Sequence, residues 1–367
     1  MKEDKIIYKI ALALIPKVGP ILARRIVSYC GGVEEVFKKK KSFLIKIPGL
    51  GDSIANNIVN PNILKQAEKE LNYIEKNNIK ILFYLDDNYP SRLSQCEDAP
   101  IIIFIKGDIN FEVSKVLSIV GTRHATNYGL DFCEKLISDL QEYKEDLIII
   151  SGLAFGIDVQ AHKCALKYGI KTVAVLGHGL NYIYPAEHRS IAKKIENNGA
   201  NITEYTSNIA PAMGNFVSRN RIIAGLSDAT IIIESRKEGG ALITAEFANS
   251  YNREVFAIPG RISDLYSEGC NNLIKTNKAA MITSANDLKY FMNWANTYPC
   301  KEVEKPLIQI SPTEEKLLNL IKENQEISID TIIRLSKLNI SEISIILFQL
   351  ECKGLIKCLP GKIYKSL

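Results

Sequence analysis

Apolar residues recur along the middle of this chain of 367 residues in short, unbroken runs. Between residues 80 and 296 these runs alternate with helical stretches of roughly 12–17 residues, and several of the runs are bounded by glycine. Runs without polar alternation are typical of strands that are covered on both faces, as in a parallel sheet. We predict strands at residues 101–105, 117–120, 147–150, 172–176, 229–233 and 254–258. The pattern therefore predicts a Rossmann-like α/β domain over residues 80–296, with a mostly parallel sheet at its core.

The first 79 residues have helical periodicity and contain an internal repeat. Residues 15–27 align with residues 47–59, and six of the thirteen positions are identical. Each copy combines a helix end, a glycine-containing turn and a new helix, as in the helix-hairpin-helix (SAM-like) module. The amides of such a turn can hold a DNA phosphate without reading bases, although packing alone would explain the same pattern. The first copy carries Lys17, Arg24 and Arg25, whereas the second offers only Asn56 and Asn57.

The end of the chain predicts a separate small domain. A polar linker at residues 297–309 precedes three helical patterns, at residues 313–323, 329–338 and 341–353. Two short strands around the turn Pro360-Gly361 follow them, so residues 310–367 are predicted to form a winged helix. Winged helices bind DNA or proteins, and this one is nearly neutral. Its sequence leaves a DNA contact, a protein contact and a structural role open.

Composition excludes several classes of protein. Apolar residues make up 46% and charged residues 24% of the chain, as in ordinary folded proteins. The longest apolar runs are far shorter than the roughly 20 residues that span a bilayer, and the start lacks the apolar segment of a signal peptide. The eight cysteines form no CxxC pair and the four histidines form no HExxH motif. We therefore expect a cytoplasmic protein without disulfides, metal or cofactor.

The positive charge is unevenly distributed. Residues 1–80 contain 15 Lys and Arg against 8 Asp and Glu, whereas residues 81–300 contain 21 against 24, which is a net charge of −3. A nucleic-acid site in the sheet domain must then depend on a few clustered arginines rather than on a broad basic field.

Two of the predicted strands end in loops that suit an anion. The first loop contains Gly121, Thr122 and Arg123, which offer close backbone approach, a hydroxyl group and a forked guanidinium that matches phosphate. The second starts at Ser151 and Gly152 and opens a helix, so its amides can form an anion nest. Ligands of open α/β sheets bind outside the carboxyl ends of the strands, where both loops lie.

Two further segments carry candidate ligands for an anion. One holds Ser218, Arg219, Asn220 and Arg221 just before a strand. The other places the pair Gly239-Gly240 at a helix N-terminus, next to Arg236 and Lys237. Carboxylates such as Asp158, Asp228 or Glu234 could instead pair with the two arginines. We expect all four loops to meet at one edge of the sheet, and the anion hypothesis requires Arg123, Arg219 and Arg221 to lie on the same side.

In combination these segments resemble the DNA processing protein A (DprA, also called Smf) family. The resemblance rests on the loops VGTR (120–123) and SGLAFGID (151–158), Tyr184-Pro185, SRNRIIAGLSD (218–228), EGGALITAEFA (238–248) and IPG (258–260). These motifs occur in the family's order, and the helical module and the winged helix fit its architecture.

The resemblance implies a non-catalytic bacterial protein of natural transformation. Such proteins bind single-stranded DNA, protect the incoming strand, load RecA recombinase on it and form homodimers. The positions that match the family's phosphate pocket are Gly121, Thr122, Arg123, Ser151, Gly152, Ser218, Arg219, Asn220, Arg221, Gly239 and Gly240. Contacts to phosphates allow a strand of any base sequence to bind, and the affinity falls as the salt concentration rises. The rings of Phe155, Tyr184 and Phe216 either stack on bases or pack within the protein.

An enzyme is the alternative interpretation. The same segments also resemble the lysine-decarboxylase-like phosphoribohydrolases, which cut the N-glycosidic bond of a nucleoside monophosphate, with Arg219 or Arg221 and Glu246 at the matching positions. However, Leu242 and Ile243 replace the Gly-Thr of that motif. We therefore expect Glu246 to pair with an arginine. A dinucleotide-dependent enzyme is not indicated, because the ribose-binding acid and the full glycine fingerprint are missing.

Overall fold

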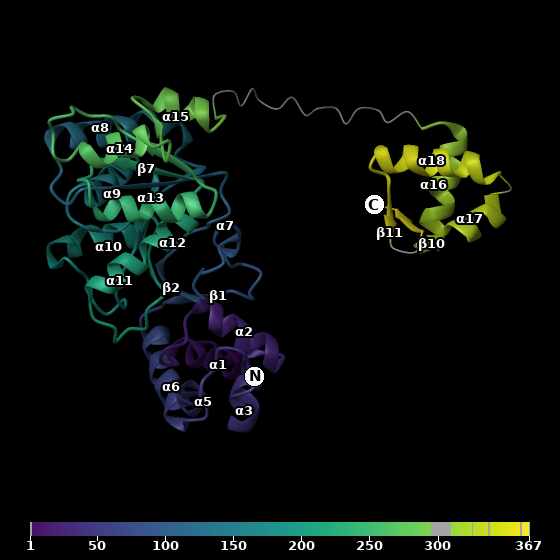
Figure 1. The fold of residues 1–367 in the computed structure, drawn as a ribbon, viewed down its shortest axis with the longest axis horizontal. Coiled ribbons are helices and arrows are strands. Elements are labelled where there is room, and N and C mark those ends of the chain that lie inside the picture. The colour runs from purple at the N-terminus through teal and green to yellow at the C-terminus, as the bar shows by residue number, and fades with distance from the viewer. Residues whose placement is uncertain (1, 295–309, 325, 337, 360–361, 367) are drawn as a thin grey trace. The chain divides into compact units, whose positions relative to one another are not determined.

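A computed structural model describes residues 2–294, 310–324, 326–336, 338–359 and 362–366 of the chain (Figure 1). The chain forms two compact units, Met1–Asn293 and Trp294–Leu367. The predicted linker at residues 297–309 lies outside the described residues. In the part of the chain that the structure describes, no helix is both long enough and apolar enough to cross a membrane.

The N-terminal part of the first unit is a bundle of helices. Its helices are α1 (Lys2–Leu14), α2 (Pro20–Cys30), α3 (Val33–Lys38), α4 (Lys41–Leu44), α5 (Asp52–Ile58) and α6 (Pro61–Lys76). The two copies of the repeat end in equivalent helices, because α2 begins after Gly19 and α5 begins after Gly51. Apolar side chains such as Ile26 and Ile58 are buried between the helices. The predicted repeat of helix, glycine turn and helix is therefore confirmed.

A nine-stranded sheet forms the centre of the first unit, in the order β1-β2-β6-β5-β4-β3-β7-β8-β9. The strands are β1 (Lys80–Phe83), β2 (Ile102–Gly107), β3 (Lys115–Gly121), β4 (Leu147–Ser151), β5 (Lys171–Val175), β6 (Ala200–Thr203), β7 (Ala229–Ile233), β8 (Glu254–Ala257) and β9 (Ala280–Met281). The strands from β6 to β9 in this order are parallel, and β1 and β2 add an antiparallel edge. All six predicted strands are confirmed, whereas β1, β6 and β9 are additional.

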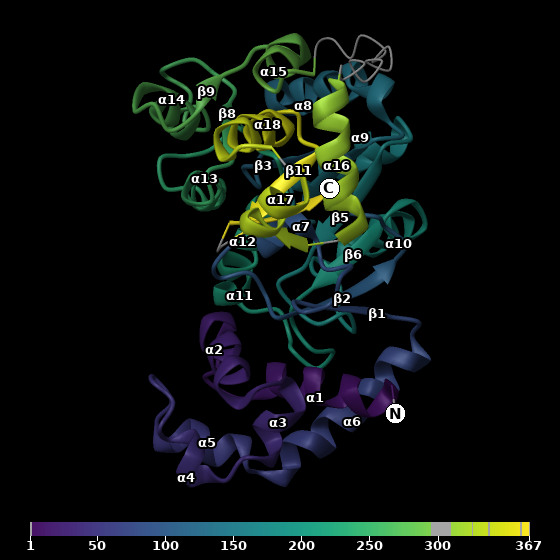
Figure 2. The same cartoon turned by 90° about the vertical axis from the view of Figure 1, so that its right-hand side faces the viewer.

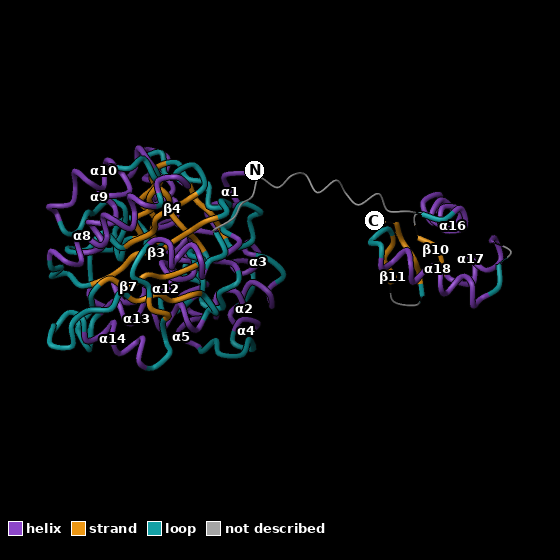
Figure 3. The backbone as a smooth tube through the Cα atoms, turned by 90° about the horizontal axis from the view of Figure 1, so that it is seen from above, coloured by secondary structure: helices purple, strands orange, loops and turns teal. Residues whose placement is uncertain are grey.

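The direction in which the chain adds strands reverses at β3. From β3 the chain continues through β4, β5 and β6 on one side, and it then returns to place β7 against the other edge of β3. Helices α8 (Asn127–Asp139), α9 (Ile157–Lys167) and α10 (Arg189–Asn198) therefore cover one face, and α13 (Gly240–Ser250) covers the other (Figure 3). Such a reversal leaves a crevice between the loops that follow the two central strands.

Shorter elements connect these layers. They are α7 (Ser91–Ser94), α11 (Met213–Ser218), α12 (Asn220–Gly225), α14 (Glu268–Lys275) and α15 (Ala285–Phe291), with 3-10 turns at Gln141–Tyr143 and Ala186–His188. The corner from α11 to α12 runs directly into β7 and lies beside α13.

The helical bundle and the sheet share one hydrophobic core. Ile10 and Ile26 of the bundle belong to the same buried cluster as Phe83 and Phe104 of the antiparallel edge. The buried carboxylate of Glu70 in α6 also accepts hydrogen bonds from the backbone amide of Ser207, at 2.7 Å, and from its hydroxyl group, at 2.6 Å. The helical bundle and the sheet domain, as far as Asn293, thus lie together in the first compact unit (Figure 2).

The second unit has the predicted winged-helix elements. Its helices are α16 (Pro312–Asn324), α17 (Ile329–Ser336) and α18 (Ile340–Cys352), and its strands are β10 (Glu326–Ser328), β11 (Ile356–Leu359) and β12 (Ile363–Ser366). Leu317, Ile332 and Leu347 form its core with other apolar residues. The hairpin of β11 and β12 is confirmed, and β10 adds a third strand beside β12.

One ion pair ties the sheet to α7. Arg92 donates to both carboxylate oxygens of Asp228, at 2.6 and 3.0 Å, and also to two backbone carbonyls. Asp228 in turn accepts a hydrogen bond from the backbone amide of Val116 at the start of β3. The side chains of Arg92 and Asp228 are only 14% and 24% exposed, so little water would replace these bonds if they were broken.

Replacing Asp228 by Ala should lower the free energy of unfolding by about 3 kcal/mol, because a partly buried guanidinium and a backbone amide lose their acceptor. Urea unfolding followed by circular dichroism measures the change. Asp139→Ala is the control, since Asp139 is exposed at the end of α8, and its effect should stay within about 0.5 kcal/mol. Equal stability of the two variants would contradict the role of this pair.

Candidate functional site

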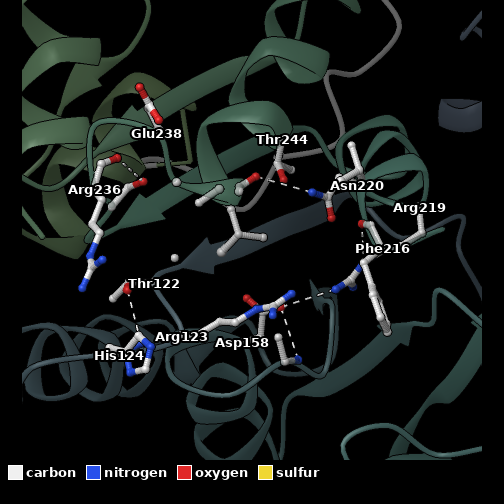
Figure 4. Close-up of a pocket in the computed structure, with 18 of the residues that line it drawn as sticks. Thr122, Arg123, His124, Asp158, Phe216, Arg219, Asn220, Arg236, Glu238 and Thr244 are labelled. Carbon is white, nitrogen blue, oxygen red and sulfur yellow. Dashed lines mark hydrogen bonds and ion pairs between the residues drawn. The ribbon is translucent and has the colours of Figure 1, made fainter. Parts of the chain in front are cut away.

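A pocket lies at the carboxyl edge of the sheet, where the strand order reverses between β3 and β7 (Figure 4). All four loops that the sequence singles out contribute to its lining, so their predicted meeting at one edge is confirmed. The lining residues used below are Gly121, Thr122, Arg123, His124, Asp158, Met213, Phe216, Val217, Arg219, Asn220, Arg236, Glu238, Gly239, Gly240, Ala241 and Thr244.

The loop after β3 is held by backbone contacts on both sides. The amide of Thr122 donates to the carbonyl of Glu234 at 2.8 Å, and the carbonyl of Thr122 accepts from the amide of Ile157 at 3.2 Å. Gly121 must be glycine here, because a Cβ atom would lie 2.0 Å from the carbonyl oxygen of Ile233 on β7. These contacts fix the point at which the side chain of Arg123 leaves the sheet.

Arg123 is exposed, and its side chain makes no ion pair or hydrogen bond within the part of the chain that the structure describes. It reaches from the loop after β3 towards Asp158 at the bottom of the pocket (Figure 4). Burial raises the pKa of the Asp158 carboxyl, while the positive charges of Arg219 and Arg123 act in the opposite direction. Arg123 therefore adds positive charge to the pocket while its donors are free for a ligand.

Arg219 is buried beneath the pocket, with only 4% of its surface exposed. Its Nη1 donates to the carbonyl of Val175 at 2.7 Å, and its Nη2 lies 3.8 Å from the carboxylate of Asp158. Gly152 makes room for it, since a Cβ atom there would lie 1.7 Å from Nη1. Burial lowers the pKa of Arg219, yet a guanidinium remains charged in proteins. The predicted alternative in which Asp158 pairs with one of the two arginines is thus correct for Arg219.

The opposite wall comes from the loop after β7 and the start of α13. Arg236 donates to the hydroxyl group of Tyr266 at 2.9 Å, and its guanidinium lies 4.9 Å from the centre of that ring. Gly239 precedes the first turn of α13, which no side chain of the described residues caps. The first amides of a helix have no partner within the helix, so the positive end of α13 is open at the pocket.

The formal charges at this edge favour an anion. The guanidinium groups of Arg123, Arg219 and Arg236 outnumber the carboxylates of Asp158 and Glu238 among the lining residues. Because the net charge of residues 81–300 is −3, folding has concentrated positive charge at this one edge. The described residues contain no group of three or more His, Cys, Asp or Glu that could hold a metal ion.

The structure brings together most of the predicted site residues. Those that line the pocket are Gly121, Thr122, Arg123, Arg219, Asn220, Gly239 and Gly240. Ser151 and Gly152 lie beneath it, where the buried hydroxyl group of Ser151 donates to the carbonyl of Ile119 at 2.6 Å. Ser218 and Arg221 line a different pocket. The expectation that all three arginines lie on one side therefore holds for Arg123 and Arg219 and is wrong for Arg221. The anion hypothesis in the form that requires all three arginines is thus wrong, and an anion site here depends on Arg123 and Arg219 together with the other groups that line the pocket.

The separation of Arg219 and Arg221 follows from helix geometry. Residues two positions apart point in directions that differ by about 200° around a helix axis. Arg221 therefore points away from the first pocket, and it pairs with Glu204, which directly follows β6, at 2.5 Å. Glu204 is not among the residues predicted from the sequence, and Arg236 is predicted only as a neighbour of the glycine pair and not as part of the site. The position of Arg236 beside the glycine pair is the signal that could have included it.

Three exposed or half-buried aromatic rings lie next to the pocket. Phe216 lines it, and its ring centre is 5.4 Å from that of Tyr184, which is 50% exposed. Phe155, in the loop after β4, is 45% exposed and contacts His188 with a separation of 4.8 Å between the ring centres. These rings have internal partners and also free faces, so both predicted roles are compatible with their positions.

The structure does not support the residues of the enzyme alternative. Gly240, Ala241 and Thr244 form the side of α13 that lines the pocket, whereas Glu246 is exposed and is not among the lining residues. The expected pairing of Glu246 with an arginine is also wrong, because Glu246 has no ion pair within the described residues. A carboxylate in this position cannot assist the departure of a base from a sugar in the pocket.

Comparison with known proteins gives consistent matches. Residues 80–293 match the model of the family described as DNA recombination-mediator protein A, and residues 302–362 match a DprA winged helix domain. Protein Smf of Synechocystis sp. is 30% identical over 400 aligned residues, which cover 100% of both chains.

Two solved structures of DNA processing protein A are also similar. The Streptococcus pneumoniae protein is 33% identical with a TM-score of 0.64, and the match covers 77% of this chain and 96% of that one. The Helicobacter pylori protein, whose structure concerns a single-stranded DNA binding mode, is 28% identical with a TM-score of 0.52, over 59% of this chain and 94% of that one.

Arg219 and Arg123 should differ in their effect on stability, because only the first is buried. We expect Arg219→Ala to lower the free energy of unfolding by about 3 kcal/mol, since Asp158 would be left buried and unpaired. Arg123→Ala, which removes an exposed side chain, should change it by less than about 0.5 kcal/mol. Urea unfolding of both variants measures the difference, and a loss for Arg219→Ala as small as that expected for Arg123→Ala would show that Arg219 has no structural role.

Proposed function

Because this chain belongs to the DNA recombination-mediator protein A (DprA/Smf) family, we propose that it binds single-stranded DNA through the pocket at the carboxyl edge of its sheet. One observation supports this proposal above the others. The exposed guanidinium of Arg123, which has no partner within the described residues, lies opposite Arg236 and the uncapped N-terminus of α13. Forked donors and helix amides are the groups that hold phosphates in proteins.

The proposed binding does not depend on base sequence. Backbone amides and arginines that contact phosphates carry no information about the bases, and such binding weakens as salt rises because counterions are released. The free faces of Phe155, Tyr184 and Phe216 are placed to stack on bases, and stacking also tolerates any base. We include Gly121, Thr122, Asn220, Gly239 and Gly240 in the phosphate site, with Ser151, Gly152 and Arg219 beneath it as its framework.

The biological role that we propose follows the family resemblance. The protein would act in the cytoplasm during natural transformation, where it would protect incoming single strands and load RecA recombinase on them. We also propose that it works as a homodimer and carries out no chemistry of its own. A protein that holds phosphates through charge and backbone amides, and that stacks only on the faces of bases, leaves the hydrogen-bonding edges of the bases accessible for pairing, which suits a recombination mediator.

Binding of a fluorescently labelled oligonucleotide, measured by anisotropy at increasing salt, tests the proposal. Arg123→Ala should weaken binding by about 1–3 kcal/mol, which corresponds to a factor of about 5–150, because a charge-assisted contact is lost. The slope of log affinity against log salt should also fall in magnitude by about 0.7.

The matched control for this experiment is Lys144→Ala. Lys144 is an exposed cation in the segment before β4, at the amino edge of the sheet, so it changes the net charge equally without touching the pocket. It should leave the affinity nearly unchanged. Unaltered binding by Arg123→Ala, or equal weakening by Lys144→Ala, would remove the support for a phosphate site at this pocket.

A second experiment distinguishes binding from hydrolysis. Incubation of the protein with AMP should release no adenine, because Glu246 lies outside the pocket and no other acid is placed at its position in the motif. Chromatography of the nucleotide products detects any release. Turnover that Glu246→Gln abolishes would contradict the proposal and would establish the phosphoribohydrolase alternative.

A further inference from the structure

A second pocket lies between the helical bundle and the corner that joins α11 to α12. Residues 19–22, at the start of α2, line it together with Arg25, Asp98, Ser218 and Arg221. All of these residues belong to the first compact unit. The pocket is distinct from the one at the carboxyl edge of the sheet, since the two share no lining residue.

The start of α2 presents free amides to this second pocket. Helix α2 has 11 residues, Gly19 precedes it, and no side chain of the described residues caps it. Pro20 has no amide hydrogen, and the amides of Ile21 and Leu22 have no partner within the helix. The partial positive charge of the helix N-terminus therefore faces the pocket.

Arg221 gives independent evidence for an absent acceptor. It is 7% exposed, and its Nη2 pairs with Glu204, yet its Nη1 is buried without a hydrogen-bond partner among the described residues. An unsatisfied buried guanidinium hydrogen is costly, and Arg221 lines this pocket, so an anion that reaches its guanidinium would supply the missing acceptor. The Oε1 atom of Glu204 is also unpartnered, and burial raises the pKa of this carboxyl.

Other groups of the second pocket also suit an anion with several oxygens. Arg25 is exposed and donates through Nη1 to the carbonyl of Pro48, which leaves its remaining donors available. Asp98 is the one carboxylate in the lining, and its negative charge opposes an anion. It accepts a hydrogen bond from the hydroxyl group of Tyr251 at 2.5 Å, and the guanidinium groups of Arg25 and Arg221 outnumber it in the lining. Arg24 takes no part, because it faces the sheet domain and donates to the carbonyl of Ala99.

The same short corner of the chain forms a wall of both pockets. Val217, Arg219 and Asn220 line the first pocket, and Ser218 and Arg221 line the second. A strand that leaves the first pocket over the end of α11 therefore meets the second one directly. This continuity favours a phosphodiester of the same strand over a carboxylate of a partner protein.

We propose that the second pocket binds a phosphodiester of single-stranded DNA, through the N-terminus of α2, Arg25, Ser218 and Arg221. This inference rests on the function proposed above and extends the path of the strand onto the helical bundle. The second copy of the repeat has no such role. Asp52 stands there where the first copy has Pro20, and its carboxylate, paired with Lys41 at 2.7 Å, would repel a phosphate.

The repeat offers a matched pair of variants for the test. Ile21 and Ser53 occupy equivalent positions in the two copies, both are exposed, and an acid near a helix N-terminus favours the helix. Ile21→Asp places a negative charge at the second pocket, whereas Ser53→Asp makes the same change away from it. Arg221 itself is unsuitable, because replacing it would leave Glu204 buried and unpaired.

Anisotropy with a labelled strand of about 20 nucleotides and with a labelled dinucleotide gives the readout, since the single phosphodiester of a dinucleotide can occupy only one of the two pockets. Ile21→Asp in the full chain should weaken binding of the longer strand about tenfold and leave the shorter one within about twofold. Ser53→Asp should change neither. Thermal unfolding checks that both variants keep the stability of the unaltered protein.

Three outcomes would overturn the inference. If Arg123→Ala weakens binding but Ile21→Asp behaves like Ser53→Asp with the longer strand, the first pocket binds DNA and the second does not. Equal weakening of both strand lengths by Ile21→Asp would show a general disturbance of the fold instead of a second contact. If the unaltered chain binds neither strand, the proposed function fails and this inference fails with it.

Discussion

The parallel pairing of β3 with β7 is the constraint from which the functional edge of this protein arises. The two strands pair in register from Leu117 opposite Ala229 to Gly121 opposite Ile233, although more than a hundred residues separate them in the chain. Because β7 joins the free edge of β3, the helices that follow the two strands must leave on opposite faces of the sheet. The loops are thereby spread apart, and the space between them is the pocket. The contact leaves no room for a side chain at Gly121, so the pairing and the shape of the pocket depend on the same glycine.

The arginines of the sheet domain that are discussed above fall into two groups, buried and exposed. Arg219 and Arg92 are largely buried and donate to backbone carbonyls and carboxylates, so their charges serve to hold loops and strands together. Arg123 is exposed and has no partner in the described part of the chain. A buried charge maintains the geometry of the site at a cost in desolvation, and an exposed one can meet a ligand without giving up an existing partner. Positive charge beneath the pocket therefore supports binding even where it does not touch the ligand.

The order of elements and the location of the site could be predicted from the sequence, and the direction of individual side chains could not. Unbroken apolar runs such as residues 147–150 are central strands because both of their faces are buried, and this produces a pattern that is easy to recognise. Strand β9 has two residues, which is too short for any period to be visible, whereas β1 begins with Lys80 and β6 contains Asn201 and Thr203, so neither is an unbroken apolar run. Arg221 shows the second limit. Its partner Glu204 lies 17 residues earlier in the chain, and only the folded corner of α11 and α12 brings the two together.

The common core of the helical bundle and the sheet has a consequence for how the chain can be divided. Ile10 and Ile26 cover Phe83 and Phe104 on the antiparallel edge, and Glu70 satisfies the backbone and hydroxyl group of Ser207. A fragment beginning at β1 would expose these rings to water, and such an apolar patch can associate with other copies of the fragment. The amino-terminal helices thus cover these apolar side chains of the sheet. Because the helices and the sheet share one core, a ligand bound to the helices is held in a fixed position relative to the sheet.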